Sequence, residues 1–175
     1  MTSLNFKLYT LHCAIVLAIA MMGCKPEPET NNSRSRDEVQ DSVLLNTVQR
    51  ASMDYMWTGA DPVSGLAYER IHLDNNYGYN DPKVITTGGS GFGIAGLVVA
   101  MERGFITREN GVERLQRIVD FLARADRFHG IWPHWLKADG KVVPFSANDN
   151  GGDLVESSFL MEGLLIARQH LDASN

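Results

Sequence analysis

The sequence is short of cysteine, of long hydrophobic runs and of excess basic charge, and each shortage excludes a class of protein. Only two cysteines occur in 175 residues, Cys13 and Cys24, which excludes a disulfide framework and a cysteine-based zinc site. A net charge of −5 gives no support to nucleic-acid binding, which usually shows as a basic patch. The one long apolar run, residues 8–22, is shorter than the ~20 residues that a membrane-spanning helix needs.

That apolar run suits the core of a secretory signal peptide instead, because Lys7 is the only charged residue before it. It ends in Met21-Met22-Gly23-Cys24, which resembles the bacterial lipobox. We therefore expect residues 1–23 to be a lipoprotein signal peptide and Cys24 to be lipidated. The protein would then be anchored to a membrane, in the periplasm or at the cell surface. The alternative is an ordinary signal peptide followed by an incidental cysteine.

Residues 24–38 are predicted to form a flexible tether. The segment contains Pro26 and Pro28, several acids and almost no apolar side chains. Such a segment cannot bury enough surface to offset the entropy lost on ordering. The folded part is therefore expected to span residues 39–175.

Apolar residues at helical spacing predict four helices in this folded part. They cover about residues 39–57, 94–103, 107–125 and 153–171, and a glycine-rich loop at 86–93 is expected to lead into the second. Thr107 and Asp153 are the expected N-caps of the third and fourth helices, because their side chains can accept hydrogen bonds from the free amides of a first turn.

A tryptophan-rich hairpin is expected between the last two helices. Ala138-Asp139-Gly140 is a strong turn signal between two apolar arms, residues 131–136 and 141–145. Each arm contains a proline, which predicts edge strands or an irregular ribbon. Trp132 and Trp135 in the first arm suit stacking on a sugar, and packing over the helices is an equal alternative.

Three carboxylates, Asp149, Asp153 and Glu156, surround Gly151-Gly152 just before the last helix. Glycoside hydrolysis needs two carboxyl groups, one that protonates the leaving oxygen and one that assists water or attacks. Because Asp149 and Asp153 are close in sequence, we expect them to act together on one side of a sugar, with the partner acid elsewhere. A purely capping role is the structural alternative for Asp153, and Glu156 could orient a hydroxyl.

Metal binding is not expected. His129 and His134 are possible ligands, but no third ligand stands at a recognised spacing. No other cofactor is indicated by the sequence.

Five motifs, taken together and in order, resemble the bacterial glucoamylase-like family, which includes endo-β-1,2-glucanases. They are residues 86–93, 102–108, 125–130, 132–135 and 149–156, and the resemblance covers about residues 40–172. It implies an all-α fold, the (α/α)6 toroid, with a glycan cleft at one end.

The resemblance also implies an inverting hydrolase acting on β-glucan, with Asp149 and Asp153 as catalytic residues. The expected substrate-binding residues are Trp132, His134, Trp135, Glu156 and Arg70. A further essential glutamate of the family would lie beyond Asn175.

A closed toroid needs many more helices than the four predicted here. We therefore expect an incomplete toroid, the N-terminal part of a glycoside hydrolase or a truncated, inactive fragment of one, with little or no activity alone. One apolar flank would lack its neighbouring helices. The alternative function is a cell-surface lipoprotein that binds glycans without cleaving them.

Overall fold

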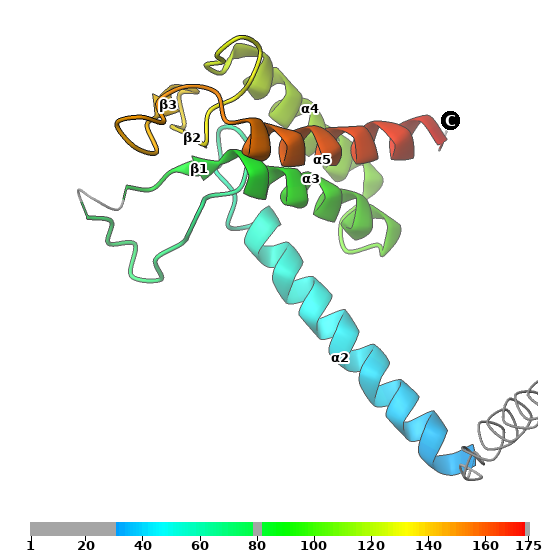
Figure 1. Cartoon of the computed structure of the whole chain (residues 1–175). Coiled ribbons are helices and arrows are strands. Elements are labelled where there is room, and N and C mark those ends of the chain that lie inside the picture. The colour runs from blue at the N-terminus through cyan, green and yellow to red at the C-terminus, as the bar shows by residue number, and fades with distance from the viewer. Residues whose placement is uncertain (1–30, 79–81, 174–175) are drawn as a thin grey trace, which may run out of the picture. The chain divides into compact units, whose positions relative to one another are not determined.

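The computed structural model describes residues 31–78 and 82–173. This part is mostly helical, as predicted. It contains the helices α2 (Asn31–Trp57), α3 (Thr87–Glu102), α4 (Arg108–Arg124) and α5 (Leu154–Ala173), and the short strands β1 (Ile85–Thr86), β2 (Trp135–Leu136) and β3 (Val142–Val143) (Figure 1). The predicted signal peptide and Cys24 lie outside the described residues. Within them, no helix is both long and apolar enough to cross a membrane.

The chain divides into two units, residues 1–45 and 46–175, and α2 contributes to both. This helix begins at Asn31 and so includes residues predicted to be tether. Neither proline nor glycine occurs between residues 31 and 57, so nothing local ends the helix before Trp57. In the second unit, Met53 is buried and Met56 packs against the core.

Helix α3 begins at Thr87, so the prediction of a loop at residues 86–93 is wrong. Thr86 caps the helix, since its side chain accepts a hydrogen bond from the Gly89 amide. Glycines of this helix allow a close approach to a neighbouring helix. A Cβ atom on Gly91 would lie 2.1 Å from the Phe159 carbonyl oxygen of α5, and one on Gly163 would lie 2.2 Å from the Gly91 carbonyl oxygen. Helices α3 and α5 therefore pack backbone against backbone, side by side (Figure 1).

Helix α4 forms as predicted. Thr107 is its N-cap and accepts a hydrogen bond from the Asn110 amide at 3.2 Å. Leu115, Ile118 and Leu122 are buried on one face. With Ile94, Leu97 and Leu160 they form the centre of the core.

The hairpin is confirmed, but its first arm is not at an edge. Strand β2 is the central strand of a three-stranded antiparallel sheet in the order β1-β2-β3. Pro133 precedes β2 and therefore interrupts no ladder hydrogen bond. Strand β1 was not predicted; Ile85 pairs with Leu136, and both side chains are fully buried. The sheet thus lies at the N-terminal ends of α3 and α5, where the acidic residues are.

Candidate active site

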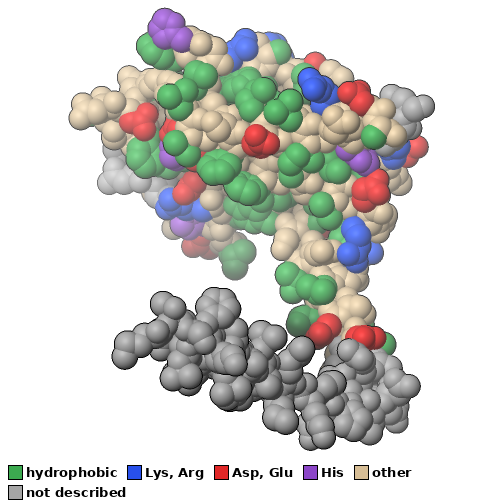
Figure 2. Space-filling view, turned by 45° about the vertical axis from the view of Figure 1, so that its right-hand side comes forward, with side chains coloured by type: hydrophobic (Ala, Val, Ile, Leu, Met, Phe, Trp, Pro, Cys, Tyr) green, Lys and Arg blue, Asp and Glu red, His purple; other side chains and the backbone are tan. Residues whose placement is uncertain are grey.

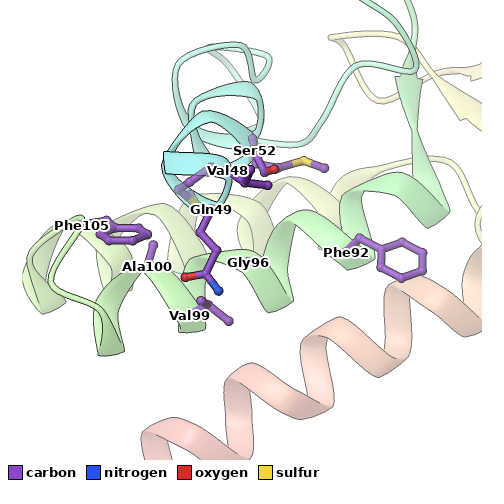
Figure 3. A pocket seen from close by; sticks show the side chains of 10 residues that line it. Val48, Gln49, Ser52, Phe92, Gly96, Val99, Ala100 and Phe105 are labelled. Atoms are coloured by element: carbon purple, nitrogen blue, oxygen red, sulfur yellow. The ribbon is translucent and has the colours of Figure 1, made fainter. Parts of the chain in front are cut away.

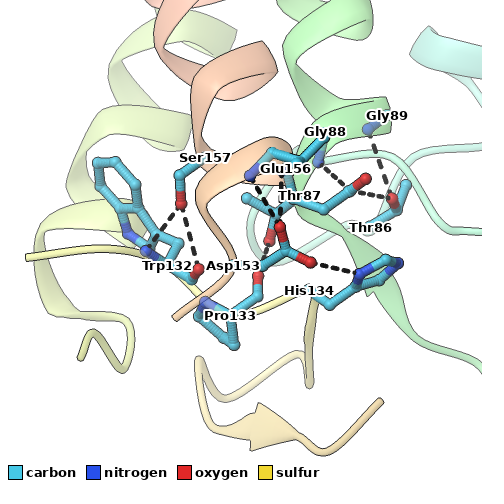
Figure 4. A network of polar contacts seen from close by, with 11 residues as sticks. Thr86, Thr87, Gly88, Gly89, Trp132, Pro133, His134, Asp153, Glu156 and Ser157 are labelled. Atoms are coloured by element: carbon cyan, nitrogen blue, oxygen red, sulfur yellow. Dashed lines mark hydrogen bonds and ion pairs between the residues drawn. The ribbon is translucent and has the colours of Figure 1, made fainter. Parts of the chain in front are cut away.

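The segment 132–134 is held between the first turns of α3 and α5 (Figure 4). The Thr87 amide donates to the His134 carbonyl at 3.1 Å, and the Thr87 hydroxyl donates to the Pro133 carbonyl at 2.6 Å. From the other side, the Asp153 amide donates to the Trp132 carbonyl at 2.8 Å. His134 and Asp153 are therefore brought together by backbone contacts from two helices.

Asp153 uses both of its carboxylate oxygens. Oδ1 accepts hydrogen bonds from the amides of Val155 (2.9 Å) and Glu156 (3.0 Å), which confirms the predicted N-cap. Oδ2 lies 2.8 Å from Nδ1 of His134 (Figure 4). Only 16% of the Asp153 side chain is exposed. The cap and the ion pair thus coexist on one partly buried carboxylate.

The pKa of Asp153 is lowered from its ordinary value of 3.8. Burial has the largest single effect and raises the pKa, but the effects that lower it together outweigh burial. They are the hydrogen bonds from the Glu156 amide and His134, the charge of His134 and the hydrogen bond from the Val155 amide. Asp153 is therefore an anion at neutral pH and is unsuited to donating a proton.

Asp149 lies beside this pair. The amides of Phe145 (2.9 Å) and Ser146 (3.2 Å) both donate to the Asp149 carbonyl, and the Asp149 amide donates back to the Ser146 carbonyl. One oxygen of Asp149, one of Asp153 and a ring nitrogen of His134 lie within 4.8 Å of one another. The two predicted catalytic aspartates are thus close in space.

These three residues are also a set that could hold a metal ion. Linear spacing did not reveal it, because His134 comes from the segment before β2. Both oxygens of Asp153 already take part in hydrogen bonds, Oδ1 with the Glu156 amide and Oδ2 with His134.

Glu156 faces the N-terminus of α3. Its Oε2 accepts a hydrogen bond from the Gly88 amide at 2.7 Å, and the Thr86 hydroxyl donates to the same oxygen at 3.5 Å. A Cβ atom on Gly88 would lie 2.6 Å from that oxygen. A carboxylate is favoured here because the helix dipole places partial positive charge at the first turn. Glu156 thus joins α3 to α5, and its role as a substrate ligand stays a prediction.

The aromatic residues separate into two groups. Trp132 packs against the core, and its Nε1 donates to the Leu122 carbonyl at 3.3 Å. Trp135 lies beside the acid cluster, with its ring centroid 5.3 Å from that of His134 and 5.0 Å from that of Phe145. Sequence reasoning did not single out Phe145.

Arg70 is exposed, and its Nη2 lies 2.8 Å from Oε1 of Glu69. The Glu69 amide donates to the Val84 carbonyl, which places this segment next to β1. A substrate-binding role for Arg70 stays a prediction.

Two of the cavities in the second unit bear on the search for a site. One, of about 210 Å³, is lined partly by Asn150 and Gly151 of the acidic loop and by Asp126 and Phe128. The other, of about 250 Å³, is an apolar groove between α2 and α3 that includes Met53 (Figure 3). No acidic side chain lines the second groove, so it offers no group for hydrolysis.

No family model matches the chain. The chain is, however, 52% identical over 137 residues to an exo β-1,2-glucooligosaccharide sophorohydrolase (non-reducing end) from Parabacteroides distasonis, a match that covers 77% of this chain and 18% of that protein. Among solved structures, it resembles an endo-β-1,2-glucanase from Chitinophaga pinensis in complex with sophorotriose and glucose. The TM-score is 0.73 at 56% identity, over 77% of this chain and 32% of that one. A β-1,2-glucanase from P. distasonis gives a TM-score of 0.69 at 50% identity, over 77% of this chain and 19% of that one.

The chain belongs to the glucoamylase-like family. The order of five motifs predicted this membership, and identities of 50–56% to the two solved glucanases confirm it. The chain spans about a fifth of the length of the P. distasonis sophorohydrolase and about a third of that of the C. pinensis enzyme.

Sequence reasoning missed three contacts of this candidate site: His134 with Asp153, Glu156 with Gly88, and Phe145 with His134. Each joins residues from different elements, so no local periodicity reports it. For the contact between Glu156 and Gly88 the sequence did offer a signal. Thr86-Thr87-Gly88-Gly89 begins with a good N-cap residue, which indicates a helix start with free amides at this point.

Proposed function

We propose that this chain is the acid-bearing part of an (α/α)6 glycoside hydrolase that cleaves β-1,2-linked glucan with inversion. The observation that carries the proposal is the His134–Asp153 pair with Asp149 beside it, at the N-terminal end of α5. The similarity to β-1,2-glucan hydrolases supports the substrate class.

The carboxylate geometry supports a role for both aspartates on one side of the sugar. The two acids of an inverting glycosidase stand ~6.5–9.5 Å apart, and those of a retaining one ~5–5.5 Å. One oxygen of Asp149 lies within 4.8 Å of one of Asp153, which favours a shared role on one face of the sugar over a split between opposite faces. In the proposal they hold and deprotonate the attacking water, and another part of the protein supplies the proton donor.

His134 keeps Asp153 in position for this role. Its Nδ1 binds Oδ2 of Asp153, while the amides of Val155 and Glu156 donate to Oδ1 and fix the plane of the carboxylate. These contacts leave the anion oriented towards Asp149.

A segment exchange tests the proposed activity. The matching segment of the C. pinensis endo-β-1,2-glucanase is replaced by that of this chain, and release of oligosaccharides from β-1,2-glucan is measured. We expect the exchanged protein to cleave the glucan and its Asp153→Asn variant to lose at least a hundredfold in kcat.

A folded exchange protein with no activity would contradict the proposal. If the Asp153→Asn variant cleaves as fast as its parent, the catalytic role of Asp153 is wrong. If the full chain and its variant bind the glucan equally well while the folded exchange protein never cleaves it, the chain is a glycan-binding protein instead.

We also propose that Cys24 is lipidated and that the protein is membrane-anchored outside the cytoplasm. The support is the apolar run before Gly23-Cys24. In a bacterial host, the full chain is expected in the membrane fraction and to take up labelled palmitate. Uptake that persists in a Cys24→Ser variant would contradict the proposed site.

A further inference from the structure

We propose that Phe145 is a glycan-binding residue, forming with Trp135 an aromatic wall on which a glucose unit stacks next to the acid cluster. This inference rests on the proposed function and adds a binding residue that the sequence motifs did not indicate. It identifies the exposed ring that would hold the sugar.

Phe145 contacts two rings, those of His134 and Trp135, and His134 is the residue that binds Asp153. Its ring centroid lies 4.3 Å from that of His134, at an interplanar angle of 33°, and 5.0 Å from that of Trp135. His134 in turn binds Asp153 at 2.8 Å. A sugar stacked on Phe145 would therefore lie near the partly buried carboxylate of Asp153.

The backbone also fixes Phe145 relative to the second acid. Its amide donates to the Asp149 carbonyl at 2.9 Å, and the Ser146–Asp149 bridge closes the same turn. Phe145 stands two residues beyond Val143, which pairs with Trp135 in the sheet. The chain that leaves β3 therefore passes beside β2, and the Phe145 and Trp135 rings meet there.

Exposure distinguishes Phe145 from Trp132, which comes from the first arm of the hairpin. Half of Phe145 is exposed, a large value for a phenylalanine already in contact with two rings. Trp132, by contrast, directs its Nε1 to the Leu122 carbonyl and packs on the core. An exposed flat apolar ring beside carboxylates matches a pyranose, which has an apolar C–H face and a rim of hydroxyls.

The test is the affinity of the full chain for sophorotriose, a β-1,2-linked glucose trisaccharide, measured by isothermal titration calorimetry. The variants are Phe145→Ala, Phe145→Leu and Phe145→Tyr. Leucine keeps apolar bulk and so protects the fold, but it has no flat face; tyrosine keeps the ring. We expect Kd to rise about tenfold for Phe145→Ala and Phe145→Leu and to stay within about twofold for Phe145→Tyr.

Phe92→Ala is the matched control. Phe92 is also exposed and contacts another ring, since its centroid lies 5.4 Å from that of Phe159, but it is on α3 among apolar residues. We expect Kd to be unchanged in this variant.

Two outcomes overturn the inference and are distinguishable. An unsubstituted chain that does not bind sophorotriose contradicts the proposed substrate, and the inference with it. An unsubstituted chain that binds, with Phe145→Leu binding equally well or Phe92→Ala losing as much, leaves the proposed function standing and shows that Phe145 does not hold the sugar.

Discussion

Asp153 shows how one side chain can serve the fold and the proposed chemistry together. Its Oδ1 satisfies two free amides at the start of α5, and its Oδ2 binds His134. The capping alternative considered for this residue is therefore confirmed without removing it from the acid cluster. The two roles lie on different oxygens, so different substitutions should separate them.

We predict that Asp153→Ala lowers the free energy of unfolding by about 1–2 kcal/mol and that Asp153→Asn lowers it by about half as much or less. Alanine removes both hydrogen-bond acceptors, whereas asparagine is as good an N-cap as aspartate. Urea denaturation followed by circular dichroism measures both values. Equal losses for the two variants would show that the charge of Asp153, rather than its capping oxygen, stabilises the helix start.

The lowered pKa of Asp153 predicts a pH dependence of stability. Because the folded pKa lies below the unfolded value of about 3.8, the unfolded chain takes up the proton first as the pH falls. The stabilisation is therefore complete above that value and is lost as the pH decreases through the folded pKa. We expect the stability advantage of the unsubstituted chain over Asp153→Asn to shrink below about pH 4. A gap that stays constant from pH 6 to pH 2.5 would contradict the assigned shift.

At the scale of elements, the contact between α3 and α5 determines where the site residues stand. Gly91 and Gly163 let the two backbones touch, and Glu156 binds the Gly88 amide one turn away. Both helices consequently start at the same end of the unit, next to the segment before β2 that contains His134. The carboxylates at this end benefit from two helix N-termini.

We predict that Gly91→Ala destabilises the protein by about 3 kcal/mol or more, or prevents folding, because the added Cβ would overlap the Phe159 carbonyl of α5. Gly96→Ala, in the same helix, is the control. Its Cβ would meet only the Met53 sulfur at 3.9 Å, so alanine should be neutral or stabilise by up to about 1 kcal/mol. Chemical denaturation of both variants is the measurement, and a Gly91→Ala variant as stable as Gly96→Ala would rule out the close contact.

The helical elements could largely be predicted from sequence, since α4 follows a clear 3.6-residue pattern, α5 has a broad apolar surface, and both have good caps, Thr107 and Asp153. The start of α3 could not, because Gly88, Gly89 and Gly91 have poor helix propensity and only tertiary contact with α5 favours a helix there. Strand β1 was missed for a similar reason. A two-residue strand has no period to detect, and its pairing partner Leu136 lies far along the chain.

At the scale of the whole molecule, the site is one end of a larger surface that includes many apolar side chains. Phe92 on α3 and Phe159 and Ile166 on α5 are more than 40% exposed. Figure 2 shows hydrophobic side chains reaching the surface between the charged ones on the face that it displays. The chain spans about a third of the C. pinensis glucanase. In the proposal, the proton donor and the other helices of the toroid therefore come from outside the described residues.

The candidate acids themselves were predictable from sequence, because Asp149 and Asp153 flank a glycine pair before a helix and lie within a family motif. His134 and Glu156 were also expected at the site, but their contacts were not, and Phe145 was not singled out. Only the folded backbone brings Phe145 next to His134.

The most direct test of the central claim is a nuclear magnetic resonance titration of the full chain with sophorotriose. The account predicts saturable shifts of the Trp135 indole N–H, the His134 ring and the amides of residues 145–156, with Asp153→Asn still binding. Saturable shifts confined to the apolar groove around Met53 between α2 and α3, or no saturable shifts at all, would contradict the claim that the acid cluster is the glycan site.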